Sequence, residues 1–324
     1  KCKTKSDVEI VPFLYRHKGI EFLNEINGMF SMVIIDEKFN KKYLIKDRYG
    51  KKPLFYNVDN NKIYFASELK CLNKLSKLNL SKINLPLYFY CSFIPEPLTI
   101  YDEIKTVLPG SFICFENEKI NEKQWYKPQI KYNNNLQEKK NFFLSFLEDS
   151  IKFRLRSDVP VGIFLSGGLD SNLILNQAAK KYPNIVSLIC DIPSKEKFSK
   201  NKTDSVNPEK ICSEKGYKFI KNTFDFDYFD KNLIKIISKV DYPILDSGSL
   251  IFYQLAEVAK KNGIKVILTG AGGDEIFGGY PWQDKLRLRN KILKMKHYLN
   301  KGDLESKIYL KRYSKSIYFR KVFR

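Results

Sequence analysis

The pattern of hydrophobic and polar residues divides the chain into two parts with different periods. Between residues 29 and 67, short β-branched and aromatic runs such as MFSMVIID and KIYFAS alternate with turn residues, which is typical of strands. The turn at Asp59-Asn60-Asn61 predicts a β-hairpin. Before the strands, DVEIVPFLYRHKGIEFL has helical character, with Gly19 as a break. We therefore expect a mostly β N-terminal part.

From about residue 136 the pattern changes to helices that alternate with buried strands. The first helix has one apolar face, formed by Leu144, Leu147, Ile151 and Leu155. The apolar strand VGIFL follows Pro160, and two further runs, IVSLIC and IKVILT, each follow a helical segment. Strands that alternate with helices predict right-handed crossovers and a parallel sheet.

Prolines recur between these two parts, at positions 86, 95, 97, 109 and 128. Such a density is typical of a connecting segment. We therefore expect a first domain over residues 1–75, a connecting segment over residues 76–135 and a second domain over residues 136–324. A chain of 324 residues is long enough for two domains of ordinary size.

The formal net charge is +21, from 57 Lys and Arg against 36 Asp and Glu. These basic residues are spread along the whole chain, which indicates a lysine-rich solvated surface. A nucleic-acid footprint is the alternative interpretation, and it would lie in the basic and aromatic segment at residues 285–324. We do not expect nucleic acid as a partner.

The six cysteines are scattered, and only 2 His accompany them, so no zinc-binding pattern is formed. We expect reduced thiols and a cytoplasmic location. No apolar run reaches the roughly eighteen residues of a membrane-spanning helix, so we expect no membrane partner. The first residues, KCKTKSDVEI, contain neither an initiator Met nor an apolar signal core, which predicts an interior start.

Two glycine-rich loops follow predicted parallel strands. In IFLSGGLDS, Gly167 and Gly168 allow the backbone to approach a ligand closely, and the N–H groups of the next helical turn favour phosphate. Asp170 cannot attract an anion itself, but it is suited to hold Mg²⁺ that bridges to phosphate oxygens. The second loop, TGAGGDEIFGGY, carries Asp274 after another strand. Ligands of parallel sheets bind at such strand ends, so both loops predict one phosphate site with a shared metal.

These loops resemble those of a known family. The S-G-G-x-D-S loop is similar to the pyrophosphate loop of ATP-pyrophosphatase-type enzymes, and G-x-G-x-D-E-x-F-G-G-Y resembles a loop of glutamine-hydrolysing asparagine synthetases. KSDVEIV, LNEINGMFSMVIID, KDRYGKKPLFY and FASELKCL resemble the second half of that family's glutaminase domain. DYPILDSGSL resembles a stretch that precedes the second loop in the family. The resemblance extends from about residue 6 to about residue 282.

The resemblance implies a fold and a reaction. The fold is an α/β, parallel-sheet ATP-pyrophosphatase domain of the adenine nucleotide alpha hydrolase-like type, preceded by a partial α+β glutaminase domain of the Ntn-hydrolase type. The reaction converts aspartate to asparagine through an aspartyl-adenylate, with ammonia from glutamine. ATP and Mg²⁺ are then the cofactors, aspartate, glutamine and ATP the small-molecule partners, and a homodimer a possible assembly.

The resemblance also implies roles for individual residues. The pyrophosphate ligands would be Ser166, Gly167, Gly168, Asp170 and Ser171. The backbone of Phe164, Cys190, Thr269 and Gly270 would contact the adenosine. Asp170 and Asp274 would hold Mg²⁺, Tyr280 would lie near the reacting carboxylate, and Asp7 would bind the amino group of glutamine.

Three features depart from the family pattern. Cys2 follows Lys1 instead of standing at a mature N-terminus, so we expect this chain alone to lack glutaminase activity. Ala271 occupies a position where the family often has an acid that supports adenylate formation or ammonia deprotonation. Nothing after Tyr280 resembles the remaining C-terminal motifs, which predicts a fragment of a longer chain.

Alternative functions remain open at this point. Ala271 is compatible with a related amidotransferase that acts on another carboxylate, such as a sugar acid. The net charge is compatible with an enzyme that adenylates a tRNA base by means of the same loop. A non-catalytic remnant that scaffolds a partner is the third alternative, because both Ala271 and the missing nucleophile would suit it.

Overall fold

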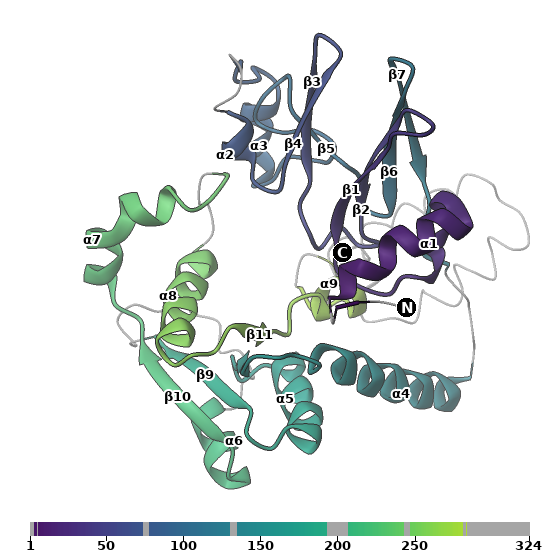
Figure 1. Cartoon of the computed structure of the whole chain (residues 1–324). Coiled ribbons are helices and arrows are strands. Elements are labelled where there is room, and N and C mark those ends of the chain that lie inside the picture. The colour runs from purple at the N-terminus through teal and green to yellow at the C-terminus, as the bar shows by residue number, and fades with distance from the viewer. Residues whose placement is uncertain are drawn as a thin grey trace, which may run out of the picture. The chain divides into compact units, whose positions relative to one another are not determined.

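The computed structural model describes residues 3–4, 6–73, 78–129, 135–192, 207–242, 247–280 and 283. The chain divides into two compact units (Figure 1). Unit 1 comprises Lys1–Leu136 and Phe226–Ser249, and unit 2 comprises Gln137–Asp225 and Leu250–Arg324. A segment from the C-terminal half of the sequence therefore belongs to the N-terminal unit. The domain boundaries expected from the sequence stay predictions.

Unit 1 contains two antiparallel sheets. The first has the order β1-β2-β6-β7, with β1 (Ser31–Asp36), β2 (Lys41–Lys46), β6 (Ser111–Glu116) and β7 (Lys119–Gln124). The second has the order β4-β3-β5, with β4 (Lys62–Ala66), β3 (Phe55–Asp59) and β5 (Lys105–Thr106). The predicted hairpin is confirmed, because β3 pairs with β4. Asn60 and Asn61 adopt the positive φ that its tight turn requires.

The core of unit 1 covers both faces of the first sheet. On one face, Tyr43 and Ile45 pack with Phe22 of the 3₁₀ segment η2 (Gly19–Glu25) and with α1 (Ile10–Lys18). The predicted break at Gly19 is confirmed, because α1 ends at Lys18 and Gly19 has φ +57°. On the other face, Leu44 and Ile113 pack with apolar residues of the second sheet.

The segment predicted as a connection contributes to this core. Its strands β6 and β7 complete the first sheet, and Phe112 and Ile113 are buried. The prolines lie outside these strands, so they do not interrupt the sheet hydrogen bonds. Three further helices of unit 1 are α2 (Leu69–Leu72), α3 (Asn84–Cys91) and α7 (Phe226–Ile237), and the 3₁₀ segment η1 spans Asp7–Glu9.

Unit 2 contains the predicted parallel sheet, which is confirmed. Its order is β10-β9-β8-β11, with β10 (Lys218–Thr223), β9 (Val186–Asp191), β8 (Val161–Phe164) and β11 (Val266–Leu268). All three pairings are parallel. The helices are α4 (Leu136–Arg154), α5 (Leu169–Lys181), α6 (Pro208–Lys215), α8 (Ser247–Lys261) and α9 (Gly273–Phe277).

Two apolar clusters in unit 2 hold its helices against the parallel sheet. α4 packs Leu147, Ile151 and Leu155 into the core beside Val161 and Ile163. Leu144, predicted on the same face, is 40% exposed, because the buried core reaches only the C-terminal half of α4. A second cluster joins Leu255 and Ala259 of α8 to Leu188 and Ile264. These two clusters fix the strands whose carboxyl ends carry the glycine loops.

Candidate active site

Three neighbouring strands bring the predicted nucleotide-binding residues to one edge of the sheet. β8 ends at Phe164, β9 ends at Asp191 and β11 ends at Leu268, and β8 lies between the other two. Carboxyl ends of parallel strands meet at the same edge, so the Ser166 loop, Cys190 and the Thr269 loop all start there. The sheet order alone therefore groups residues that are about a hundred positions apart in the sequence.

The first loop is held in shape by its own hydrogen bonds. Gly167 is buried and has φ +81°, a conformation that favours glycine. The Gly168 N–H donates to Ser166 Oγ at 3.3 Å, and the Ser166 and Ser171 hydroxyl oxygens lie 3.1 Å apart. Asn172 Nδ2, which the sequence analysis did not single out, donates to the Gly168 carbonyl at 2.9 Å. This preformed loop leads into α5, whose first-turn N–H groups favour an anion.

The second loop lies directly against the first. A β-carbon at Gly270 would stand 3.0 Å from Asp170 Cβ and 3.1 Å from the backbone nitrogen of Ser171. At Gly273 it would stand 2.1 Å from Asp170 Oδ2, which is far inside van der Waals contact. These two glycines therefore leave the space that the Asp170 side chain occupies. The predicted pyrophosphate loop and the predicted metal-binding loop are therefore in contact.

Carboxylates gather at this contact and perturb one another. Burial raises the pKa of Asp170 above its ordinary value, and the negative charges of Asp274 and Glu275 raise it further. A cation between these groups would relieve the repulsion and favour the ionised form of Asp170. No group of three or more His, Cys, Asp or Glu ligands occurs in the part of the chain that the structure describes. Mg²⁺ fits such a site, because it typically uses one or two carboxylates together with phosphate oxygens and water.

Glu275 organises the second loop and is a residue that the sequence analysis did not assign. Its Oε2 accepts the Gly272 N–H at 3.0 Å at the start of α9, and its Oε1 accepts the Tyr280 hydroxyl at 2.8 Å. The Tyr280 hydrogen bond is the largest cause that lowers the pKa of Glu275, and it raises the pKa of Tyr280 in turn. The charges of Asp274 and Asp170 also raise the pKa of Tyr280, so all four side chains share one environment.

The strand ends that would contact adenosine are half-buried. The Phe164 ring packs against Phe252 of α8, with centroids 5.5 Å apart. Burial, and to a smaller extent Asp191, raises the pKa of the Cys190 thiol to about 11, so this cysteine is neutral and packs as an apolar group. Thr269 Oγ1 accepts the Ala271 N–H at 3.4 Å. Phe252 is a further residue that the sequence analysis missed, because its contact with β8 is not local.

The predicted glutamine contact lies in the other unit. Asp7 is exposed in η1 at the start of the described part of unit 1. It is therefore not among the residues that the parallel sheet brings together. Cys2 and the basic segment at residues 285–324 lie outside the described residues.

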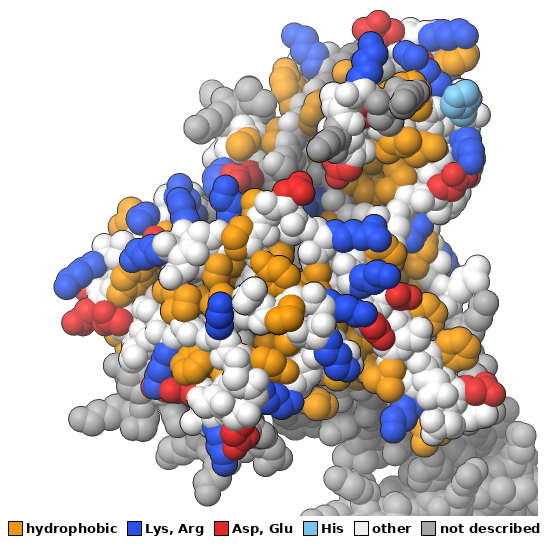
Figure 2. All heavy atoms as spheres, turned by 60° about the horizontal axis from the view of Figure 1, so that its bottom comes forward, with side chains coloured by type: hydrophobic (Ala, Val, Ile, Leu, Met, Phe, Trp, Pro, Cys, Tyr) orange, Lys and Arg blue, Asp and Glu red, His pale blue; other side chains and the backbone are white. Residues whose placement is uncertain are grey.

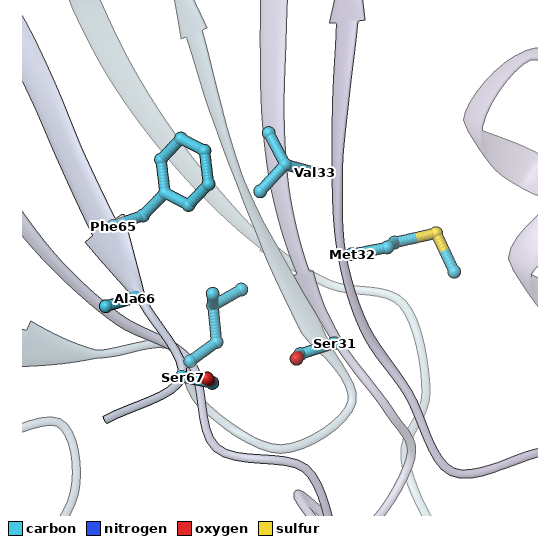
Figure 3. A pocket seen from close by; sticks show the side chains of 7 residues that line it. Ser31, Met32, Val33, Phe65, Ala66 and Ser67 are labelled. Carbon is cyan, nitrogen blue, oxygen red and sulfur yellow. The ribbon is translucent and has the colours of Figure 1, made fainter. Parts of the chain in front are cut away.

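Unit 1 contains a small hollow between its two sheets. The cavity has a volume of about 230 Å³ and lies between β1 and the end of β4 (Figure 3). Its lining consists of Ser31, Met32, Val33, Leu54, Phe65, Ala66 and Ser67. Figure 3 shows Phe65 and Val33 projecting toward the space between the strands. None of the predicted site residues lines this cavity.

The parallel sheet with two glycine loops in contact, together with the two-sheet unit 1, has the α/β fold expected from the sequence, an ATP-pyrophosphatase-type domain preceded by a glutamine amidotransferase-type part. Protein-family models agree with this class: a glutamine amidotransferase domain matches residues 1–126, and asparagine synthase matches residues 143–322. Because the asparagine synthase model covers more than half of the sequence, the chain belongs to the asparagine synthase family. The fold class expected from the sequence is confirmed.

Curated relatives carry matching names. A putative glutamine-hydrolyzing asparagine synthetase 2 of Methanocaldococcus jannaschii is 31% identical over 86% of this chain and 55% of its own length. The glutamine-hydrolyzing asparagine synthetase 1 of Bacillus subtilis is 32% identical over 86% of this chain and 43% of its own length. Amidase chry2 of Gibberella zeae is 28% identical over 85% of this chain and 43% of its own length. The chain thus spans about half the length of the curated relatives it matches.

Proposed function

We propose that this chain carries the ATP-dependent, amide-forming site of a glutamine-hydrolysing asparagine synthetase. The observation that carries the proposal is the contact between Asp170 and the Gly270–Gly273 backbone. This contact joins a preformed phosphate-type loop to a second loop that holds two more carboxylates. The family membership and the names of the curated relatives support the same reaction class.

In the proposed reaction, a carboxylate oxygen of aspartate attacks the α-phosphorus of ATP, and the bond to pyrophosphate breaks. The N–H groups at the start of α5 and the Ser166 and Ser171 hydroxyls bind the departing pyrophosphate. Ammonia then attacks the aspartyl carbon, the amide forms, and AMP leaves. Bound Mg²⁺ would neutralise phosphate charge, and Asp170 and Asp274 are the residues that would hold it.

The adenosine would bind at the ends of β8, β9 and β11. The backbone groups of Phe164, Cys190, Thr269 and Gly270 are placed along this edge, and the neutral Cys190 adds no charge. Tyr280 would lie near the reacting carboxylate. Its hydroxyl donates to Glu275, so this pair keeps a negative charge at the side of the site where the carboxylate is activated.

Position 271 bears on which carboxylate accepts the ammonia. Ala271 supplies no proton-exchanging group at the position of the family's acid. Glu275 is engaged by Gly272 and Tyr280, so it is not placed as a free replacement. A related amidotransferase that acts on another carboxylate is therefore the second candidate, and one relative is named an amidase rather than a synthetase. Aspartate-dependent and sugar-acid-dependent exchange of pyrophosphate into ATP would separate the two.

Ammonia would come from glutamine, for which Asp7 is the proposed contact in unit 1. We propose that the 324 residues by themselves do not hydrolyse glutamine, since Cys2 lacks the expected N-terminal setting. Purified protein should use ammonium salts and not glutamine as the nitrogen source. Glutamate release from glutamine by these residues would refute this part of the proposal.

Nucleic-acid binding and a scaffolding role receive less support. On the face shown in Figure 2, Lys and Arg side chains are interspersed with acidic and hydrophobic ones instead of forming one stripe. A tRNA-adenylating enzyme would require tRNA binding that weakens steeply with salt. A non-catalytic remnant would show no exchange of pyrophosphate into ATP.

We propose a cytoplasmic location and a homodimeric assembly. Five cysteines are free thiols in the described part of the chain, which is what a cytoplasmic protein would have. No helix among the described residues is both long and apolar enough to cross a membrane. A homodimer is the assembly to test by sedimentation.

Thermal unfolding with Mg-ATP tests the proposed function. A ligand at about a hundred times its Kd stabilises the folded state by about 2.7 kcal/mol. We expect saturating Mg-ATP to raise the Tm of the wild type and to leave the Tm of Asp170→Ala unchanged. If ATP does not alter the wild-type Tm and Asp170→Ala is equally stable, the nucleotide site is refuted.

A further inference from the structure

The backbone of Gly168 takes part in a ring of hydrogen bonds within the first glycine loop. The Gly168 N–H donates to Ser166 Oγ at 3.3 Å, and the Ser171 hydroxyl donates to the Gly168 carbonyl at 3.1 Å. The two hydroxyl oxygens lie 3.1 Å apart. Because a hydroxyl has a single hydrogen to donate, Ser171 donates to Gly168 and accepts from Ser166. The ring therefore uses both hydroxyl hydrogens inside the loop.

This ring conflicts with the proposed role of the two serines. A hydroxyl that binds pyrophosphate has to donate to it, because phosphate oxygens are acceptors. A hydroxyl hydrogen that turns to the phosphate leaves its partner in the loop. When the Ser171 hydroxyl turns away, the Gly168 carbonyl loses one of its donors. Water has little access to this part of the loop, since Ser171 is only 4% exposed.

Asn172 supplies the same carbonyl with another side-chain donor. Its Nδ2 donates to the Gly168 oxygen at 2.9 Å. This hydrogen bond is shorter than the one from Ser171 at 3.1 Å and the one from the Asn172 backbone N–H at 3.2 Å. A carbonyl oxygen has two lone pairs. The amide and the backbone N–H of Asn172 can therefore occupy both of them after the Ser171 hydroxyl has turned away.

The Asn172 amide keeps this orientation although its other end is unsatisfied. Among the described residues, its Oδ1 is buried and has no hydrogen-bond partner. The reversed amide would place Oδ1 against the Gly168 carbonyl oxygen, and two acceptors repel each other. A buried acceptor without a partner calls for an explanation. The donation from Nδ2 to Gly168 provides one.

We propose that Asn172 is a positioning residue for pyrophosphate and that it acts through Ser171. When pyrophosphate binds, the Ser171 hydroxyl turns from Gly168 to a phosphate oxygen, and the Asn172 amide keeps the Gly168 carbonyl in place. The ring thus opens without leaving this carbonyl to the backbone N–H alone. The inference rests on the proposed function and specifies how its first loop exchanges hydrogen-bond partners on binding.

The expected effect on affinity comes from this exchange of partners. Without the Asn172 amide, the Gly168 carbonyl keeps only the backbone N–H of residue 172 once Ser171 has turned to the ligand. A hydrogen bond of ordinary net strength corresponds to about a fivefold change in Kd. If Ser171 does not turn, the carbonyl has the same partners with and without ligand. The amide would then have no effect on the Kd.

The test measures the Kd of the whole chain for Mg-ATP by calorimetric titration. Asn172→Ala removes the donor, and we expect the Kd to rise at least about 5-fold. Asn172→Ser is almost as small, but its hydroxyl can donate to the carbonyl four residues back, so it should recover most of the lost affinity. Asn176→Ala is the matched control and should leave the Kd unchanged. Asn176 Nδ2 donates in the same way to the Asn172 carbonyl at 2.9 Å, one turn further along α5.

The Ser171→Ala background gives a readout that a general loss of structure would not give. In this background the Gly168 carbonyl has the same partners before and after binding, so adding Asn172→Ala should no longer raise the Kd. Mg-ATP suits this comparison, because its adenosine end makes contacts that do not involve Ser171. Thermal melting without nucleotide checks that each variant is folded. If Asn172→Ala does not fold, Asn172→Leu replaces it, because leucine is similar in size to asparagine and has no donor.

Four results would overturn the inference. They are an unchanged Kd in Asn172→Ala, no recovery in Asn172→Ser, an equal loss of affinity in Asn176→Ala, and a loss that persists at full size in the Ser171→Ala background. Any of these results in a chain whose wild type binds Mg-ATP refutes the role of Asn172 alone. A wild type that binds no Mg-ATP would refute the proposed function, and the role of Asn172 would fail with it.

Discussion

Oδ2 of Asp170 occupies the position next to Gly273 where any other residue would carry its side chain: a β-carbon there would stand only 2.1 Å away. Gly273 is the first residue of α9, and Asp170 lies in the first turn of α5. The two loops of unit 2 thus meet at the Asp170 carboxylate. A larger residue at position 273 would displace this carboxylate, and a shorter residue at position 170 would remove it.

Gly273→Ala tests this relationship. The new methyl group would displace the flexible end of Asp170 and not the backbone, so we expect little loss of stability. Mg-ATP affinity should fall at least about tenfold, which corresponds to about 1.4 kcal/mol. Gly28→Ala is the matched control, because its β-carbon would meet only Phe30 at 3.9 Å. Titration of Mg-ATP into both variants checks the prediction, and equal affinities would contradict it.

Asp170→Asn should separate stability from binding. The folded-state pKa of Asp170 is raised by burial and by the charges of Asp274 and Glu275, so its ionised form destabilises the folded protein. At neutral pH we expect Asp170→Asn to be as stable as the wild type or up to about 2 °C higher in Tm, while Mg-ATP binding is lost. Calorimetric melting with and without nucleotide measures both effects.

The difference in Tm between Asp170→Asn and the wild type should depend on pH, and its direction follows from the raised pKa of Asp170. A carboxyl group with a raised pKa in the folded state lowers the free energy of unfolding. This loss is fully present at a pH above the folded-state pKa and disappears at a pH below the ordinary Asp pKa of about 3.9. The gap in Tm between Asp170→Asn and the wild type should therefore narrow as the pH falls. A gap that widens toward acid pH would contradict the assigned cause.

Tyr280→Phe probes the Glu275 pair. Loss of the hydroxyl removes the largest cause that lowers the pKa of Glu275, so that pKa should rise toward its ordinary value. We expect kcat for the proposed reaction to fall about tenfold or more, with little change in the Kd for Mg-ATP, because the hydroxyl lies on the proposed acceptor side. A variant with lower ATP affinity and unchanged kcat would assign Tyr280 to nucleotide binding.

An ion pair in unit 1 with a buried lysine and a partly exposed glutamate gives a prediction about stability. Lys46 is 2% exposed, and its Nζ donates to Glu96 Oε1 at 2.7 Å and to Thr106 Oγ1 at 3.2 Å. Glu96→Gln leaves the buried ammonium without its charged partner, and we expect a loss of about 1–3 kcal/mol. Lys46→Met combined with Glu96→Gln should be more stable than Glu96→Gln alone. Urea unfolding of the three proteins measures this order, and a double variant that is the least stable would refute it.

The sequence predicts the local features of this fold well. The turn at Asn60 and Asn61, the break at Gly19 and the alternation of strands with helices all depend on residues that are close in the chain. Local backbone preferences and hydrophobic periods decide such features. The glycine loops belong to this group, because each loop directly follows its strand.

Features that depend on distant residues could not be predicted in the same way. The docking of Tyr242 on Tyr88, and the membership of α7 in unit 1, join segments more than a hundred residues apart. The segment that contains β6 and β7 resembles a proline-rich connection in the sequence, and only the pairing of β6 with β2 and of β7 with β6 shows that it is part of the first sheet. The Glu275–Tyr280 hydrogen bond is not evident from the sequence, because it depends on how the second loop folds back and not on a motif.

The most direct test of the account is the exchange of labelled pyrophosphate into ATP by the purified chain, with and without aspartate. The account predicts exchange that requires aspartate and Mg²⁺ and that is lost in Asp170→Asn and in Gly273→Ala but retained in Gly28→Ala. Binding of Mg-ATP without exchange in the presence of aspartate and Mg²⁺, or exchange that survives in Asp170→Asn, would contradict it.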